Sequence, residues 1–79
     1  MHKVTVYSTP SCHFCHMAKD YFKEKGVEFT DIDVAADPAK RKEMVDLTKQ
    51  LGVPVIRIDD SFVVGFNKPR LMELLGLSD

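Results

Sequence analysis

The chain has 79 residues, 44% of them hydrophobic and 29% charged, and its formal net charge is −1. This length and composition predict one ordinary globular domain over residues 1–79 rather than a disordered segment. The near-neutral charge argues against a nucleic-acid partner, and no run of about 18 apolar residues is present that would predict a membrane span.

The first third of the chain predicts two strands with a helix between them. Residues 3–7 alternate and are rich in β-branched side chains, as strands are. Ser11, or the residues just before it, can cap a helix, and Gly26 can end it. Five apolar residues fall at helical spacing between them: Phe14, Met17, Ala18, Tyr21 and Phe22. Residues 27–34 alternate again, and we expect the two strands to be parallel, joined by a right-handed crossover.

A second helix is predicted in the middle of the chain. Asp37 can cap this helix, with Pro38 at its first position, and Gly52 can end it. Its apolar face is formed by Met44, Leu47 and Leu51.

The last part of the chain predicts a hairpin and a helix. Residues 55–58 and 62–64 flank Asp59-Asp60-Ser61, which indicates two strands joined by a turn. Asn67 can cap the last helix, whose apolar residues are Leu71, Met72, Leu74 and Leu75. The predicted order of elements is therefore β-α-β-α-β-β-α.

The two cysteines of the chain stand together in Cys12-His13-Phe14-Cys15-His16. This segment fits three chemistries: a C-x-x-C redox dithiol, a C-x-x-C-H haem-attachment motif, and a zinc site made from cysteines and histidines. The amino terminus carries no secretory signal, so we expect a cytoplasmic protein. In that compartment a cysteine pair is more often catalytic or metal-binding than a structural disulfide.

The predicted helix separates the members of this motif. Cys12 lies at the helix start, where free backbone N–H groups and the positive end of the helix dipole favour a thiolate. On a helical wheel, Cys15 lies at the border of the apolar stripe, beside Phe22, and His16 lies in solvent. We therefore expect Cys12 to be the exposed, activated thiolate and Cys15 the shielded second thiol. His16 and His13 are interpreted as bystanders, with a small pH-dependent effect of His13 on Cys12 as a hypothesis.

The context favours the dithiol over the other two chemistries. A haem needs a second axial ligand and an open pocket, and the methionines of the chain already fit apolar stripes. A zinc site needs four converging ligands, and His13 projects away from Cys12, Cys15 and His16. A C-x-x-C motif that follows a first strand and opens a helix is typical of thioredoxin-like redox proteins. We therefore expect a redox dithiol without a bound metal or cofactor, and the haem and zinc sites are the alternatives.

Three segments, in order and over nearly the whole chain, resemble the glutaredoxins and their short glutaredoxin-like relatives. VYSTPSCHFC is similar to the first strand, loop and active-site C-x-x-C of that family. Gly52-Val53-Pro54 resembles its Thr-Val-Pro segment, whose proline follows a cis peptide bond and faces the active site. Val64-Gly65-Phe66 resembles the start of its Gly-Gly segment.

The resemblance implies a single glutaredoxin-like domain with the α/β thioredoxin-like fold, a four-stranded mixed sheet with helices on both faces. It implies a monomeric thiol–disulfide oxidoreductase that reduces protein or glutathione mixed disulfides, with Cys12 as the nucleophile and Cys15 as the resolving thiol. The backbone of Val53 would pair with the substrate as an added strand. The residues expected to bind substrate are Thr9, Phe14, Val53, Pro54, Gly65 and Phe66.

The departures from the family pattern concern the substrate. Thr9 stands where glutathione-using members usually carry lysine, and Gly52 replaces the threonine of Thr-Val-Pro. The segment Gly65-Phe66-Asn67-Lys68-Pro69 instead resembles the redoxins that serve ribonucleotide reductase and take electrons from thioredoxin reductase. We therefore expect either glutathione, as a co-substrate, or a thioredoxin-reductase-type flavoenzyme as the electron donor. The alternative function on the same fold is an iron–sulfur cluster carrier, in which two chains each contribute the first cysteine.

Overall fold

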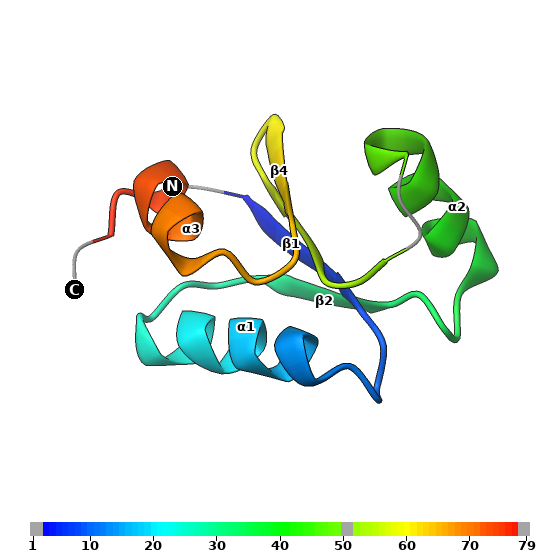
Figure 1. Ribbon diagram of the computed structural model, residues 1–79, viewed down its shortest axis with the longest axis horizontal. Coiled ribbons are helices and arrows are strands. Elements are labelled where there is room, and N and C mark those ends of the chain that lie inside the picture. The colour runs from blue at the N-terminus through cyan, green and yellow to red at the C-terminus, as the bar shows by residue number, and fades with distance from the viewer. Residues whose placement is uncertain (1–2, 50–51, 78–79) are drawn as a thin grey trace.

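The computed structural model describes residues 3–49 and 52–77 of the chain. Its elements follow the predicted order, β-α-β-α-β-β-α (Figure 1). They are β1 (Val4–Ser8), α1 (His13–Glu24), β2 (Thr30–Asp33), α2 (Pro38–Thr48), β3 (Val55–Ile58), β4 (Ser61–Val64) and α3 (Lys68–Leu75).

The four strands form one mixed sheet in the order β2-β1-β3-β4. Strand β1 pairs with β2 in parallel, as expected for strands joined through a helix, and it pairs with β3 in antiparallel fashion. Strands β3 and β4 form the predicted hairpin, in which Ile58 lies opposite Ser61 and the turn is Asp59-Asp60. The predicted four-stranded mixed sheet is confirmed.

Helices cover both faces of this sheet because side chains alternate along each strand. Val4 and Val6 of β1 point to one face, where they pack with residues of α1 and α3, and Tyr7 points to the other, where it packs with Met44 of α2. Figure 1 shows α2 standing apart from α1 and α3. The larger cluster, on the α1 and α3 face, contains Val4, Val6, Ala18, Tyr21, Phe22, Ile56, Ile58, Val63, Leu71 and Leu75.

The predicted caps of α2 and α3 are confirmed. The Asp37 side chain accepts a hydrogen bond from the Lys40 backbone N–H at 3.1 Å, and Pro38 occupies the first helical position. The Asn67 side chain accepts from the Arg70 backbone N–H at 3.3 Å. Each cap satisfies an N–H group that the helix itself leaves without an acceptor.

The predicted end of α2 at Gly52 is wrong. The helix ends at Thr48, because Lys49 takes a left-handed conformation with φ of 61° and its N–H donates to the Val45 carbonyl at 2.7 Å. Leu47, expected on the buried face, is only half-buried, whereas Thr48 is buried and donates its hydroxyl to the Met44 carbonyl. Leu51 lies outside the described residues.

Strand β2 is shorter than the predicted strand over residues 27–34. Pairing with β1 begins at Thr30, which lies opposite Thr5, and the strand ends at Asp33. Val27 belongs to the helix end instead, since its N–H donates to the Phe22 carbonyl at 2.8 Å. Alternation predicted a longer strand because Val27 and Phe29 do pack against the core, although they do not pair with β1.

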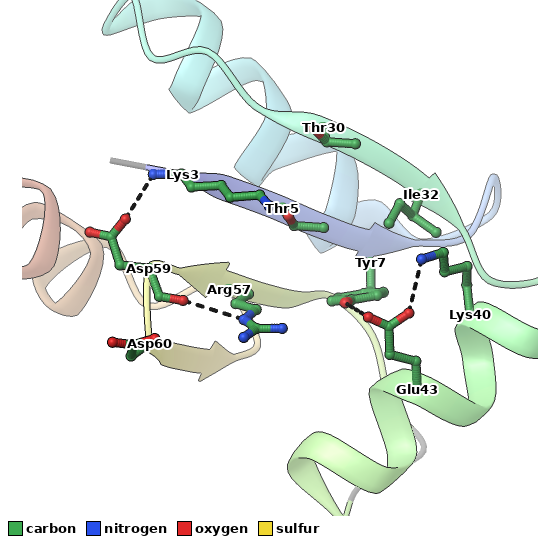
Figure 2. A pocket seen from close by; sticks show the side chains of 10 residues that line it. All are labelled: Lys3, Thr5, Tyr7, Thr30, Ile32, Lys40, Glu43, Arg57, Asp59 and Asp60. Atoms are coloured by element: carbon green, nitrogen blue, oxygen red, sulfur yellow. Dashed lines mark hydrogen bonds and ion pairs between the residues drawn. The ribbon is translucent and has the colours of Figure 1, made fainter. Parts of the chain in front are cut away.

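A groove of about 620 Å³ lies on the α2 side of the sheet (Figure 2). Within it, the Tyr7 hydroxyl donates to Glu43 at 3.3 Å, and Lys40 forms an ion pair with the same carboxylate at 3.0 Å. The lining residues are Lys3, Thr5, Tyr7, Thr30, Ile32, Lys40, Glu43, Arg57, Asp59 and Asp60. The groove therefore contains neither cysteine and none of the predicted substrate-binding residues. No helix in the described ranges is long and apolar enough to cross a membrane.

Candidate active site

The thiol of Cys12 caps the amino terminus of α1, where the sequence placed it. Its sulfur accepts a hydrogen bond from the Cys15 backbone N–H at 3.1 Å, and the side chain is partly exposed. The Cys12 N–H donates to the Thr9 carbonyl at 3.3 Å, which holds the loop against the helix start. Cys12 thus takes the cap position expected of Ser11. The Cys12 sulfur therefore lies against a backbone N–H donor at the amino-terminal end of the helix.

The thiol of Cys15 is fully buried, beneath the first turn of α1. Burial raises the pKa of this thiol from its ordinary value of 9.0 to about 12, and the hydrogen bond and charge of Cys12 add to the rise. A hydrogen bond from the Thr9 backbone and the charge of Lys19 act in the opposite direction. The two thiols of the motif are therefore in different environments, one open to a substrate and one held as a neutral thiol.

The buried face of α1 differs from the predicted stripe. Cys15 lies inside this face, with Ala18, Tyr21 and Phe22, and not at its border. Phe14 and Met17, expected within the stripe, are 57% and 38% exposed. The first turn of α1 presents Phe14 to solvent two residues from Cys12. That Phe14 contacts substrate stays a prediction.

The two histidines of the motif are exposed. His16 Nε2 lies 2.8 Å from the Pro10 carbonyl oxygen, so Nε2 carries the proton in this contact. The His13 ring packs edge-on against Phe14, with 5.7 Å between ring centroids. Neither contact involves a cysteine sulfur, in agreement with the interpretation of both residues as bystanders. The hypothesis that His13 acts on Cys12 stays a prediction.

The Val53-Pro54 and Gly65 segments lie at the same end of the sheet as the cysteines. Val55 of β3 pairs with Tyr7 of β1 in antiparallel register, which places the residues before Val55 beside those that follow Tyr7. The Val53-Pro54 peptide bond is cis, as the resemblance implied. The Gly65 N–H donates to the Pro54 carbonyl at 2.7 Å, so these two segments are joined.

Two of the expected substrate-binding residues carry further structural detail. Gly65 has φ of 84°, a conformation that side-chain-bearing residues rarely adopt, and the space around its Cα is open. Phe66 is half-buried and contacts the Tyr21 ring edge-on at 5.9 Å between centroids. Phe66 therefore packs against the core as well as lying next to the expected binding segment.

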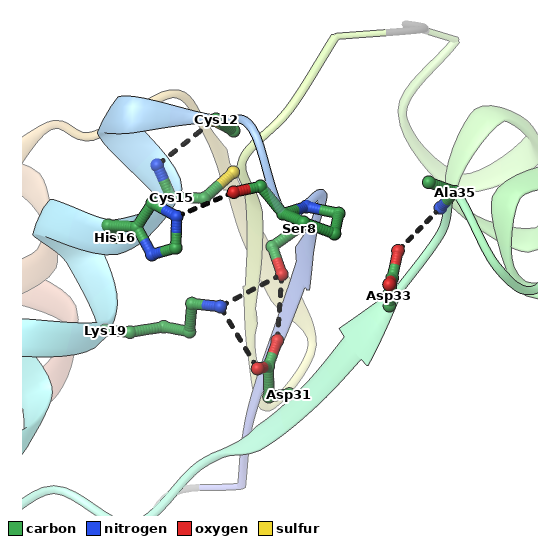
Figure 3. Close-up of polar contacts among 9 residues, drawn as sticks. Ser8, Cys12, Cys15, His16, Lys19, Asp31, Asp33 and Ala35 are labelled. Carbon is green, nitrogen blue, oxygen red and sulfur yellow. Dashed lines mark hydrogen bonds and ion pairs between the residues drawn. The ribbon is translucent and has the colours of Figure 1, made fainter.

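Three polar residues near Cys15 were not recognised in the sequence. Lys19 on α1, Ser8 on β1 and Asp31 on β2 form a hydrogen-bonded cluster (Figure 3). The position of Lys19, one helical turn after Cys15, was a signal for it. Ser8 and Asp31 carry no local signal, because only the parallel pairing of β1 and β2 brings them together. Among residues 3–49 and 52–77, no three His, Cys, Asp or Glu side chains are grouped to hold a metal ion.

The arrangement defines a class of protein before any comparison. A partly exposed thiol at a helix start, followed three residues later by a buried thiol, stands at the strand-to-helix turn of a βαβ unit. This is the site of the thioredoxin-like thiol–disulfide redox proteins.

Comparisons with known proteins assign the family within this class. The glutaredoxin family model matches residues 4–63. The glutaredoxin-like 8.6 kDa protein of the Clostridium pasteurianum rubredoxin operon is 47% identical over 72 residues, covering 91% of this chain and 96% of that protein. Glutaredoxin 3 of Escherichia coli K12 is 35% identical over 65 residues, covering 82% and 78%. A mutant of the thioredoxin-like protein BC3987 has a crystal structure with a TM-score of 0.91 at 31% identity, covering 99% and 100%.

The chain therefore belongs to the glutaredoxin family and has the thioredoxin-like fold. It is a thiol–disulfide oxidoreductase, as the members of this family are, and its substrates are disulfides.

Proposed function

We propose that the protein reduces disulfides through both cysteines, with Cys12 as the nucleophile and Cys15 as the resolving thiol. The observation that carries this proposal is the asymmetry of the pair: the Cys12 sulfur is accessible and accepts an amide N–H, and the Cys15 sulfur is buried. Thiolates, not thiols, attack disulfides, so the site has one thiol ready to react and one held in reserve.

In the first step, the Cys12 thiolate attacks one sulfur of the substrate disulfide. A new S–S bond joins Cys12 to that half of the substrate, and the other half leaves as a thiolate. The amide donor at 3.1 Å and the amino terminus of α1 are already in place for the charge on the attacking sulfur.

In the second step, Cys15 loses its proton and attacks the Cys12 sulfur. The bound half of the substrate leaves as a thiolate, and a disulfide between Cys12 and Cys15 remains. Two electrons have then passed to the substrate. A reductant must supply two electrons to the oxidised protein before the next cycle.

The substrate is proposed to bind along Phe14, Val53, Pro54, Gly65 and Phe66, with Thr9 on the loop before Cys12. The Pro54 side chain itself is fully buried, so it is proposed to shape this surface from within. Support comes from the strand register, which sets residues 53 and 54 beside the end of β1, and from the hydrogen bond between Gly65 and Pro54. In this arrangement an extended substrate segment can pair with the Val53 backbone, as an added strand does. The exposed Phe14 ring supplies apolar contact.

The proposed electron donor is a thioredoxin-reductase-type flavoenzyme or glutathione, and the proposed substrates are protein disulfides and glutathione mixed disulfides. Thr9 in place of lysine removes a cation from the expected glutathione site, which favours the flavoenzyme. We propose a cytoplasmic monomer that acts without a bound cofactor, with glutathione as a possible co-substrate only.

The donor is tested by reducing the oxidised protein in two parallel assays. One assay contains glutathione with glutathione reductase, and the other contains thioredoxin reductase. In both assays the rate of reduction is measured as the consumption of NADPH. We expect faster reduction in the assay with thioredoxin reductase. Reduction only in the assay with glutathione and glutathione reductase would overturn the preference for the flavoenzyme. The Cys12→Ser variant must lose turnover in both assays if Cys12 is the nucleophile. A coloured dimer that loses its visible absorbance in that variant would instead support the iron–sulfur cluster carrier.

A further inference from the structure

Ser8 on β1, Lys19 on α1 and Asp31 on β2 form a hydrogen-bonded cluster that joins these three elements. The Ser8 hydroxyl donates to Asp31 Oδ1 at 2.8 Å, and Lys19 Nζ donates to Asp31 Oδ2 at 3.1 Å and to Ser8 Oγ at 3.4 Å. Ser8 is 2% exposed, and the Lys19 side chain is 16% exposed. A surface lysine is usually free to move in solvent, whereas this ammonium is held in one place by two partners.

The cluster lies beside the resolving thiol. Lys19 follows Cys15 by four residues on α1, which puts the two side chains on neighbouring turns of the same helical face. Figure 3 shows Cys15 and Lys19 extending from α1 on the side where β1 carries Ser8. The charge of Lys19 acts on Cys15, where it favours the thiolate.

The second step of the proposed mechanism needs such a charge. Burial is the largest cause that keeps Cys15 a neutral thiol, and it persists when Cys12 has been joined to the substrate. The hydrogen bond and negative charge of Cys12 are then gone, because its sulfur is in a disulfide. Two groups that favour the Cys15 thiolate then remain: the Thr9 backbone, through its hydrogen bond, and Lys19, which supplies the positive charge. Asp31 lies behind Lys19, and the exposed His16 is turned to the Pro10 carbonyl.

We infer that Lys19 promotes the resolving step by stabilising the thiolate of Cys15, and that Asp31 and Ser8 are positioning residues that hold Lys19 in place. The inference rests on the proposed two-cysteine function. Lys19 does not touch the substrate and takes no part in the attack by Cys12. Its removal should therefore slow the second step alone.

The test follows both steps with the chromogenic disulfide dithionitrobenzoate in a stopped-flow instrument. One coloured thiolate is released when Cys12 attacks, and a second is released when Cys15 resolves the mixed disulfide. In Lys19→Met, the first release should keep its rate and the second should slow about tenfold at pH 7, the effect of raising a pKa by one unit. The pH profile of the second phase should move about one unit to higher pH, and Lys19→Arg should restore most of the rate.

Two controls separate a charge effect from a structural one. Lys40→Met removes a comparable ion pair, with Glu43 at 3.0 Å on the α2 side of the sheet, and should change neither phase. Lys19→Gln keeps a donor for Asp31 without the charge, and replaces Lys19→Met if that variant does not fold. An unchanged second phase in a folded Lys19→Met or Lys19→Gln protein would overturn the role of Lys19 and leave the two-cysteine mechanism intact. Absence of any second release from the unmodified protein would instead overturn the mechanism.

Discussion

When the reduced protein is alkylated, the reaction rates of Cys12 and Cys15 should differ by several orders of magnitude. Iodoacetamide reacts with thiolates. With a pKa of about 12, Cys15 is a thiolate in about one molecule in 10⁴ at pH 8. An ordinary cysteine with a pKa of 9.0 is about one-tenth thiolate at the same pH. Ionisation alone therefore slows the reaction of Cys15 about 1,000-fold, and its burial slows it further.

The measurement is peptide mass spectrometry after timed labelling at pH 8. Cys12 should be fully labelled before any label is detected on Cys15. In a Cys12→Ser variant, where Cys15 is the remaining cysteine, labelling of Cys15 should rise with pH above 8, by up to about tenfold for each pH unit. In guanidinium chloride the two cysteines should react at similar rates, because unfolding removes the difference in environment.

One outcome would refute this reasoning. If Cys15 in the folded protein is labelled within tenfold of the rate of Cys12 at pH 8, its thiol is neither buried nor held protonated. The assignment of Cys15 as the reserve thiol would then fail, whatever the activity of the protein.

Three further predictions concern stability. Asp37→Ala removes the cap of α2 and should lower the free energy of unfolding by about 1 kcal/mol in urea titrations, with unchanged stability as the contrary result. Tyr21→Phe should not destabilise the protein in the same assay and should gain up to about 1 kcal/mol, because the buried Tyr21 hydroxyl has no hydrogen-bond partner in residues 3–49 and 52–77. Because the pKa of Cys15 is raised in the native state, the folded protein keeps the thiol proton above pH 9, whereas the unfolded chain loses it. The free energy of unfolding should therefore fall from pH 9 toward 12, by up to about 1.4 kcal/mol per pH unit. Thermal melts of Cys15→Ala should show a shallower pH dependence, and an equal slope would contradict the assignment.

The parts of the site that depend on local structure could be predicted from the sequence. The β-branched strand, the break at Pro10 and the helical spacing after it place Cys12 at a helix start, and the structure confirms this. The shielding of Cys15 also followed from helical geometry. The full burial of the Cys15 thiol does not follow, because helical spacing alone assigns Phe14 and Met17 to the apolar stripe. The structure leaves those two side chains exposed.

The parts that depend on distant residues could not be predicted in this way. Asp31 lies 23 residues from Ser8, and only the register of the parallel strands brings their side chains to 2.8 Å. The end of α2 at Thr48 is a local feature that also could not be predicted, because lysine as a residue type does not indicate the left-handed conformation of Lys49. The hydrogen bond between Gly65 and Pro54 was implied by no pattern within either segment.

The central claim, that Cys12 attacks and Cys15 resolves, is tested most directly by counting released thiolates. The reduced protein and its Cys15→Ser and Cys12→Ser variants are each mixed with one equivalent of dithionitrobenzoate. The released thiolate is measured by its absorbance, and the protein mass is then determined by mass spectrometry. We expect two released thiolates and an internal disulfide for the unmodified protein, and one thiolate with a stable adduct on Cys12 for Cys15→Ser. Cys12→Ser should release none over the same time. Rapid release from Cys12→Ser, or loss of the adduct from Cys15→Ser as fast as in the unmodified protein, would contradict this claim.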